Sequence, residues 1–92
     1  MSPNPSPDGA VLSFALPAAA SVLVEIYDPA GRRLGSPLGR GWVEMPAGPG
    51  IHRWDGRMEG GRRLPPGVYF VRMLVRDALG ETARTFKWSL LR

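Results

Sequence analysis

Hydrophobic and polar side chains alternate along four stretches of the chain, with the period of two residues that is typical of a strand with one buried face. These stretches are 10–16, 21–28, 68–77 and 81–91. The expected core-facing residues along them are Leu12, Phe14, Leu16, Val22, Val24, Ile26, Tyr69, Val71, Met73, Val75, Phe86, Trp88 and Leu90. Polar residues such as Glu25, Arg72 and Lys87 fall on the opposite faces. We therefore expect four half-buried β-strands.

Prolines and glycines between these stretches predict turns. Asp28-Pro29-Ala30-Gly31 has the residues of a tight turn, and 78–80 should join the last two strands into an antiparallel hairpin. Three shorter strand candidates, 32–38, 42–45 and 51–54, occupy the middle of the chain. Because proline cannot donate to a β-ladder, Pro37 confines the first of them to a sheet edge or a bulge. No apolar period of 3.6 residues persists long enough to predict a helix.

The count and spacing of these elements predict the fold class. About seven short strands separated by frequent turns are typical of an antiparallel β-sandwich. A chain of 92 residues, with 12 glycines and 10 prolines, suits one such all-β domain, which we place at 10–92. Residues 1–9 contain Pro3, Pro5 and Pro7, so we expect an extended, proline-rich linker there.

Charge and composition exclude several classes of protein. The 12 basic residues exceed the 8 acidic ones by four, but acidic residues are interleaved with the arginines, so no basic stripe for nucleic acid is expected. The absence of cysteine excludes disulfides and thiolate metal sites. The apolar runs are too short to span a bilayer, and the first residues lack the pattern of a signal peptide. We expect no membrane insertion. If the protein is exported, we expect its targeting information upstream in a longer parent chain or at the carboxyl end.

Candidate catalytic residues are few. His52 is the single histidine and has no cysteine to activate, and no serine lies in a G-x-S-x-G elbow. Asp55 and Glu59 are carboxylates in an arginine-bearing turn, without a sign of a pocket that would raise one pKa. We therefore expect a non-enzymatic domain without a cofactor. Asp55, Gly56 and Glu59 leave a structural calcium ion open, although the alternating acidic positions of an EF-hand are missing.

Five motifs, in this order, carry a resemblance to a known family. They are Asn4-Pro5, Phe14-Ala15-Leu16-Pro17, Val24-Glu25-Ile26-Tyr27-Asp28-Pro29-Ala30-Gly31-Arg32, His52-Arg53-Trp54-Asp55-Gly56-Arg57 and Gly61-Arg62-Arg63-Leu64-Pro65-Pro66-Gly67-Val68-Tyr69-Phe70-Val71-Arg72. From Asn4 to Arg92 the chain resembles the Ig-like domain of flagellar hook-capping proteins of the FlgD type, and the related carboxyl-terminal sorting domains of type IX secretion cargo. The main departure is 35–50, which is richer in glycine and proline. The resemblance implies an Ig-like β-sandwich.

The residues that carry this resemblance have plain roles in folding. Trp54 can fill the core while its indole N–H finds a carbonyl, and Asp55-Gly56 can begin a turn. The hydroxyl of Tyr69 can anchor a corner through a backbone group. The expected fold-determining residues are Tyr27, Asp28, Gly31, Trp54, Asp55, Gly56, Gly67 and Tyr69.

The resemblance also implies a function. The segment 85–92 is similar to the terminal strand of type IX sorting domains, which makes Lys87, Trp88, Leu90, Leu91 and Arg92 the candidate sorting or interaction residues. A strand at this position can offer backbone groups to a receptor by β-augmentation. We expect a carboxyl-terminal module of a larger bacterial protein, secreted or on the cell surface, with the secretion machinery as its protein partner.

Two other functions remain open on the sequence. The domain can be a structural spacer or assembly module, as in hook-capping proteins, which contacts neighbouring domains of the parent chain; its last strand is then an ordinary edge strand. A carbohydrate-binding or nucleic-acid-binding sandwich would instead use exposed aromatic residues, such as Trp42 or Tyr27, beside arginines.

Overall fold

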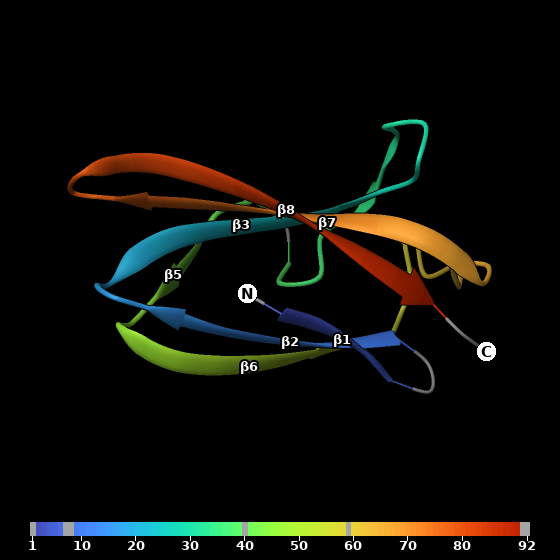
Figure 1. Ribbon diagram of the computed structural model, residues 1–92, viewed down its shortest axis with the longest axis horizontal. Coiled ribbons are helices and arrows are strands. Elements are labelled where there is room, and N and C mark those ends of the chain that lie inside the picture. Colours follow the sequence, from blue (N-terminus) through green and yellow to red (C-terminus); the bar gives the residue numbers. More distant parts are fainter. Residues whose placement is uncertain (1, 7–8, 40, 59, 91–92) are drawn as a thin grey trace.

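The protein is built from two antiparallel β-sheets that face each other (Figure 1). The computed structural model describes residues 2–6, 9–39, 41–58 and 60–90, which form strands and no helix. The strands are β1 (Ser2–Ser6), β2 (Gly9–Leu16), β3 (Ala20–Tyr27), β4 (Arg33–Gly35), β5 (Val43–Met45), β6 (Gly48–Trp54), β7 (Gly67–Asp77) and β8 (Gly80–Leu90). Strands β2 to β8 are the seven that the sequence predicts, and the all-β sandwich is confirmed.

One sheet has three strands and the other has five. The three-stranded sheet has the order β1-β2-β6, and the larger sheet has the order β4-β3-β7-β8, with β5 also paired to β3. Every strand pair is antiparallel. Strands β4 and β5 thus share one side of β3, whereas β8 forms the opposite edge of the larger sheet. No helix in the described residues could cross a membrane.

The core lies between the two sheets and follows the predicted alternation. Along β3, Val22, Val24 and Ile26 are buried, whereas the residues between them are half-buried on the outer face. The buried core comprises Ala10, Leu12, Leu16, Ala20, Val22, Val24, Ile26, Leu34, Trp54, Leu64, Tyr69, Val71, Met73, Trp88 and Leu90. Phe14 and Val75 are partly buried and pack against it. The predicted core faces are therefore confirmed, with the exception of Phe86, which is half-buried and lies outside this core.

The amino-terminal segment differs from the expected linker, because Ser2–Ser6 forms strand β1. It pairs with β2, with Ser2 opposite Ser13 and Ser6 opposite Gly9. In an antiparallel strand, alternate residues direct their N–H groups to the same side. Pro3 and Pro5 therefore remove donors from one side of β1 and leave the other side able to pair. Proline is tolerated here because β1 is an edge strand.

The middle of the chain follows the prediction with changes at the boundaries. Strand β4 is short and lies at the sheet edge, and its pairing with β3 shifts register between Ile26 and Tyr27. Strand β6 begins at Gly48, upstream of the expected 51–54. Within the added residues, Gly50 lies close to Phe14: a Cβ built there would lie 2.7 Å from the ring. Glycine allows β6 to pass over that ring, a contact invisible in local sequence.

The last two strands form the predicted hairpin. Its register runs from Gly67 opposite Leu90 to Asp77 opposite Gly80, so two residues, Ala78 and Leu79, make the turn. The backbone N–H of Leu79 donates to Oδ1 of Asp77 over 2.8 Å, which fixes the turn as an aspartate typically does. The hairpin thereby places β8 at the edge of the larger sheet (Figure 1).

Candidate functional site

Strand β8 contains the described part of the expected sorting segment, and its side chains divide between two faces. Lys87 is exposed on the outer face, in register with Phe70 of β7 and Tyr27 of β3. Trp88 and Leu90 point the other way and are buried in the core. Leu91 and Arg92 lie outside the described residues. Of the five predicted interaction residues, Lys87 is therefore the described one whose side chain can meet a partner directly.

The burial of Trp88 and Leu90 corrects the expectation that they form an interaction surface. Trp88 keeps 1% of its surface exposed and Leu90 keeps none. Alternation places both residues on the core side of an edge strand, where the smaller sheet covers them. Trp88 and Leu90 hold β8 in place. A partner would therefore bind the backbone edge of the strand and its outer side chains.

Three aromatic rings join β8 to the rest of the core. The ring of Trp88 lies 5.1 Å from that of Trp54 and 5.6 Å from that of Tyr69, with tilted planes in both pairs. Tilted rings at such distances attract each other beyond their burial, by about 0.5–1.5 kcal/mol a pair. Trp54 comes from β6 of the smaller sheet, whereas Tyr69 and Trp88 belong to the larger one. The cluster therefore ties the two sheets together.

Loop 55–66 is fastened to this cluster by hydrogen bonds of the kind that the sequence predicts. The indole N–H of Trp54 donates to the carbonyl of Arg57 over 3.2 Å. The hydroxyl of Tyr69 donates to the carbonyl of Pro65, which makes the expected corner. Asp55 accepts the backbone N–H of Arg57 over 3.1 Å, and Gly56 has a positive φ of 74°. Both ends of the loop are thus held by the aromatic core.

Trp88 also carries a buried polar atom. Its Nε1 has no hydrogen-bond partner among the residues that the structure describes. A buried donor without a partner typically costs about 1–3 kcal/mol. The ring contacts with Trp54 and Tyr69 offset this cost. The role of Trp88 is therefore to pack the core.

The turn after β3 contains the second half of the motif at 24–32. The carbonyl of Asp28 accepts the N–H of Gly31 over 2.9 Å, and its Oδ1 accepts the N–H of Arg32 over 2.9 Å. The carboxylate also pairs with the guanidinium of Arg32 at 3.2 Å. Gly31 has a φ of 89°, a conformation that favours glycine. Asp28 and Gly31 therefore shape the turn from β3 to β4.

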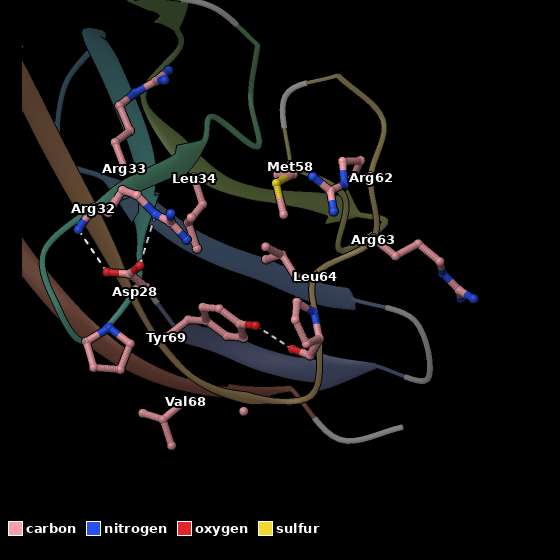
Figure 2. Close-up of a pocket in the computed structure, with 13 residues that line it drawn as sticks. Asp28, Arg32, Arg33, Leu34, Met58, Arg62, Arg63, Leu64, Val68 and Tyr69 are labelled. Carbon is pink, nitrogen blue, oxygen red and sulfur yellow. Dashed lines mark hydrogen bonds and ion pairs between the residues drawn. The ribbon is translucent and has the colours of Figure 1, made fainter.

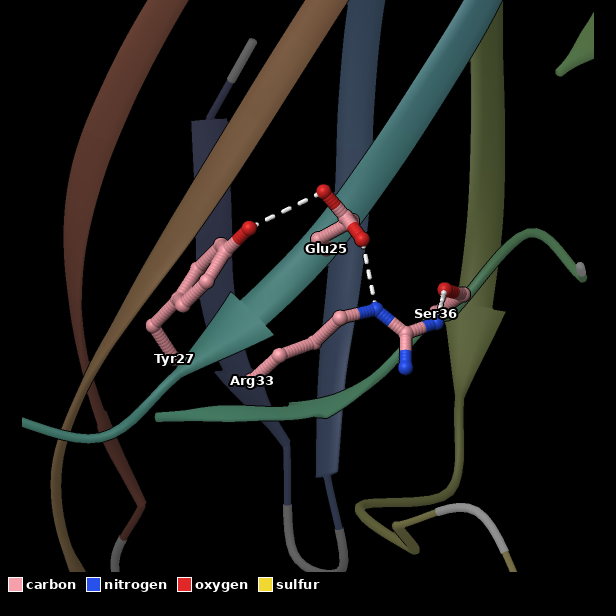
Figure 3. Close-up of polar contacts among 4 residues, drawn as sticks. All are labelled: Glu25, Tyr27, Arg33 and Ser36. Atoms are coloured by element: carbon pink, nitrogen blue, oxygen red, sulfur yellow. Dashed lines mark hydrogen bonds and ion pairs between the residues drawn. The ribbon is translucent and has the colours of Figure 1, made fainter. Parts of the chain in front are cut away.

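A polar network spans β3 and β4 beside this turn (Figure 3). The hydroxyl of Tyr27 donates to Oε1 of Glu25 over 3.0 Å, and Nε of Arg33 donates to Oε2 of Glu25 over 2.5 Å. The guanidinium of Arg33 also donates to Ser36 over 2.6 Å. Burial raises the pKa of Tyr27, and the hydrogen bond and charge of Glu25 raise it further. The hydroxyl of Tyr27 is thus hydrogen-bonded within its own sheet.

The described candidate catalytic and metal-binding residues make other contacts and do not form one site. His52 Nε2 lies 2.9 Å from the carbonyl oxygen of Pro37, a contact that links β6 to the segment after β4. The carboxylate of Asp55 is exposed and lies 3.7 Å from Nε of Arg57. Glu59 lies outside the described residues. Within the described ranges, no three histidine, aspartate or glutamate side chains gather as they would around a metal ion.

The aromatic residues considered for ligand binding do not form a row. Trp42 precedes β5, and its ring is covered by the guanidinium of Arg76, whose Cζ lies 4.1 Å from the ring centroid. Tyr27 lies on the same sheet and bonds to Glu25. Each ring thus has a partner within the molecule, and the two do not line a shared pocket.

The sequence interpretation missed a cavity at the end of the sandwich. Its volume is about 810 Å³, and its walls come from the turn after β3, from β4, and from loop 55–66 with the start of β7 (Figure 2). Arg32, Arg33, Arg62 and Arg63 belong to the lining. Arg62 and Arg63 lie in a glycine- and proline-bearing loop, where arginines are typical of a solvated turn. Two arginine pairs separated by almost thirty residues were the available signal, but only the fold brings them to one cavity.

Comparisons with known proteins find relatives among solved structures. No family model and no curated protein matches this chain. It is similar to the dimeric latent PorU of Porphyromonas gingivalis, with 27% sequence identity and a TM-score of 0.74, over 97% of this chain and 9% of that one. It is also similar in fold to PorZ, an essential bacterial surface component of the type-IX secretion system of Porphyromonas gingivalis, with 24% identity and a TM-score of 0.54.

The PorZ alignment covers 98% of this chain and 11% of PorZ. The chain thus corresponds to a small part of each of these longer proteins. The expected relation to type IX secretion proteins is supported at the level of one shared domain. The resemblance to hook-capping proteins stays a prediction.

Proposed function

We propose that this chain is a non-catalytic Ig-like module of a larger bacterial protein, secreted or on the cell surface, and that it serves type IX secretion as a sorting or attachment domain. One observation carries the proposal: nearly the whole chain superposes on part of PorU, with a TM-score of 0.74 and 27% identity. The likeness in fold to PorZ, a surface component of that secretion system, supports it.

Strand β8 offers a physical means of recognition. Among the described strands it pairs with β7 alone, so its other edge has no ladder partner, although β1 of the smaller sheet lies close to β8. An extended segment of the secretion machinery can add to such an edge, and outer side chains such as Lys87 then give specificity. The buried Trp88 and Leu90 fix β8 to the core. The proposed partner is therefore a protein.

The contacts of the polar residues support a non-catalytic role. His52 faces a backbone carbonyl and Asp55 caps a turn beside an arginine, so neither is positioned against a nucleophile. General acid–base chemistry needs a base within hydrogen-bond reach of the group that it deprotonates. We propose that these residues stabilise loops.

An export assay tests the sorting role. Residues 4–92 are fused behind a periplasmic reporter in a bacterium that has type IX secretion, and we expect the reporter at the cell surface or in the medium. Removal of Leu90 would disturb the core, so the informative variant is Lys87→Glu, which changes an exposed residue of β8. Its control is Arg53→Glu, which also replaces one basic residue by glutamate, at an exposed position of β6.

The expected result is loss of export for Lys87→Glu, with unchanged melting temperature and with normal export of Arg53→Glu. A folded fusion that stays in the periplasm while an authentic sorting domain is exported contradicts the sorting role. Equal export of both variants would contradict the part assigned to Lys87.

A spacer or assembly role is the second candidate, and one surface favours it. On the outer face of the larger sheet, Leu23, Phe70 and Leu74 are half-buried apolar residues on the adjacent strands β3 and β7. Such a face suits contact with a neighbouring domain. This role predicts a stable domain that does not direct export, so the same assay separates the two functions.

A further inference from the structure

The cavity at the end of the sandwich has basic side chains on facing walls. Figure 2 shows the guanidinium groups of Arg32 and Arg62 directed into the cavity from opposite sides, whereas those of Arg33 and Arg63 extend away from it. Arg32 comes from the turn after β3, and Arg62 comes from loop 55–66. Asp28 is the single acidic residue among the described residues that line the cavity. The cavity therefore carries an excess of positive charge.

The two arginines that point into the cavity differ in whether they form an ion pair. Nε of Arg32 lies 3.2 Å from the carboxylate of Asp28, which fixes the direction of its exposed side chain. Within the described ranges, the exposed side chain of Arg62 makes no ion pair. A guanidinium presents a planar set of donors that suits a carboxylate bidentately. An anionic group between the two walls would meet one oriented guanidinium and one unpaired guanidinium.

The floor of the cavity is apolar. Leu34, Leu64 and Tyr69 line it and are buried, and Met58 is half-buried at the wall beside Arg62. At about 810 Å³ the space exceeds the need of a single small anion and falls in the range of sites for larger ligands. A ligand that fills it would place an apolar side chain on Leu34 and Leu64 beneath its charged groups.

A free strand edge adjoins this floor. Two of the three residues of β4, Arg33 and Leu34, line the cavity, and β4 pairs with β3 alone among the described strands. Its second edge therefore presents backbone donors and acceptors beside the basic and apolar surfaces. An extended peptide satisfies such an edge by main-chain hydrogen bonds, with alternate side chains in pockets. A phosphate group would leave both the edge and the floor unused.

We propose that this cavity is a binding site for an extended acidic peptide, in which carboxylates contact Arg32 and Arg62 and an apolar side chain rests on Leu34 and Leu64. The backbone of the peptide lies along β4. The strand β4 that would bind the peptide is at the other edge of the larger sheet from β8, whereas the cavity wall at the start of β7 lies next to the end of β8. Peptide binding here requires no secretion machinery. Its test is therefore independent of the export assay.

Binding to the whole chain is measured by calorimetry with a blocked nonapeptide in which glutamate alternates with valine. One control peptide has glutamine for glutamate, and a second has serine for valine. We expect the acidic peptide to bind about tenfold more tightly than either control. Because the contact is ionic, affinity should fall as salt is raised. Amide resonances of Arg33–Gly35 should shift on binding.

The protein variants locate the site. Arg62→Gln should weaken binding about tenfold. Arg53→Gln, which removes the same charge from exposed β6 outside the cavity, should leave binding unchanged. Circular dichroism checks that each variant is folded, and both substitutions are at exposed positions, where folding is least affected.

Three results would overturn the proposal. The acidic and glutamine peptides could bind equally, or Arg53→Gln could weaken binding as much as Arg62→Gln. Tighter binding of inorganic phosphate, or of phosphatidylglycerol vesicles, than of the acidic peptide would assign the arginines to a phosphate ligand instead.

Discussion

The indole rings of Trp54 and Trp88 meet across the two sheets, with centroids 5.1 Å apart and planes inclined by 55°. Trp54 ends the last strand of the smaller sheet, and Trp88 lies near the end of the last strand of the larger one. The WDG motif at 54–56 and the proposed recognition strand β8 are thus parts of one packing unit. A substitution of either tryptophan should therefore disturb packing in both sheets.

Removing the ring of Trp88 should lower the free energy of unfolding by a large amount. Trp88→Ala leaves a cavity between Trp54 and Tyr69, and we expect a loss of about 3–5 kcal/mol in the free energy of unfolding. Trp42→Ala is the control, since that ring lies under Arg76 outside the core, and it should cost about 1 kcal/mol or less. Urea denaturation followed by circular dichroism measures both. Equal losses would contradict the assignment of Trp88 to the core.

The hydroxyl of Tyr69 should contribute a smaller, separable amount. Tyr69→Phe keeps the ring against Trp88 and removes the hydrogen bond to the carbonyl of Pro65. We expect a loss of about 0.5–1.5 kcal/mol, the usual net contribution of one hydrogen bond. Thermal melting of the variant against the parent chain measures it. A variant as stable as the parent would show that the corner is held by packing alone.

Tyr27 should ionise at higher pH than an ordinary tyrosine. Burial, and then the hydrogen bond and charge of Glu25, raise its pKa above 10.0. Because the folded state prefers the protonated phenol, its contribution to stability is complete below pH 10.0 and is lost as pH rises towards the folded pKa. Titration of phenolate absorbance, with Tyr27→Phe for assignment, measures it. Glu25→Gln should lower this pKa; an unchanged value would exclude Glu25 as a cause.

Two glycines should differ in their tolerance of alanine. A Cβ at Gly9 would lie 2.0 Å from the carbonyl oxygen of Trp54, whereas one at Gly50 would lie 2.7 Å from the ring of Phe14. Backbone cannot yield as a side chain can, so Gly9→Ala should be the more destabilising. We expect about 1–3 kcal/mol for Gly50→Ala.

The Phe14→Leu background isolates the contact at Gly50. The shorter side chain removes the ring that the new Cβ would meet, so Gly50→Ala should cost less there than in the parent chain. A double-mutant cycle from urea melts gives the difference. Additive losses would show that Phe14 is not the cause.

Local alternation and turn chemistry were sufficient to predict the seven strands of the sandwich and most of its core. They identified the inner face of β3 and the corner made by Tyr69 because these depend on neighbouring residues. The proline-rich strand β1 was missed, since three prolines usually indicate a linker and only its partner β2 makes it a strand. Leu64 was missed for a similar reason: it enters the core from a loop without periodicity.

The sites depend still more on the fold than the strands do. Trp88 and Lys87 are adjacent in sequence, and the alternation that the sequence shows already assigns them to opposite faces. That assignment conflicts with grouping them as one interaction surface. The basic cavity needs the turn after β3 and loop 55–66 in three dimensions, so no local pattern could have revealed that Arg32 and Arg62 face each other.

The prolines of β1 have a consequence for how such domains coexist at high concentration. An edge with intact N–H groups is a template on which a second molecule can grow a continuous ribbon. Pro3 and Pro5 leave one side of β1 short of donors at alternate positions, so a neighbouring copy finds no complete ladder on that side. At high concentration, two domains should therefore not pair along this side of β1. Any intermolecular strand pairing should begin at another strand.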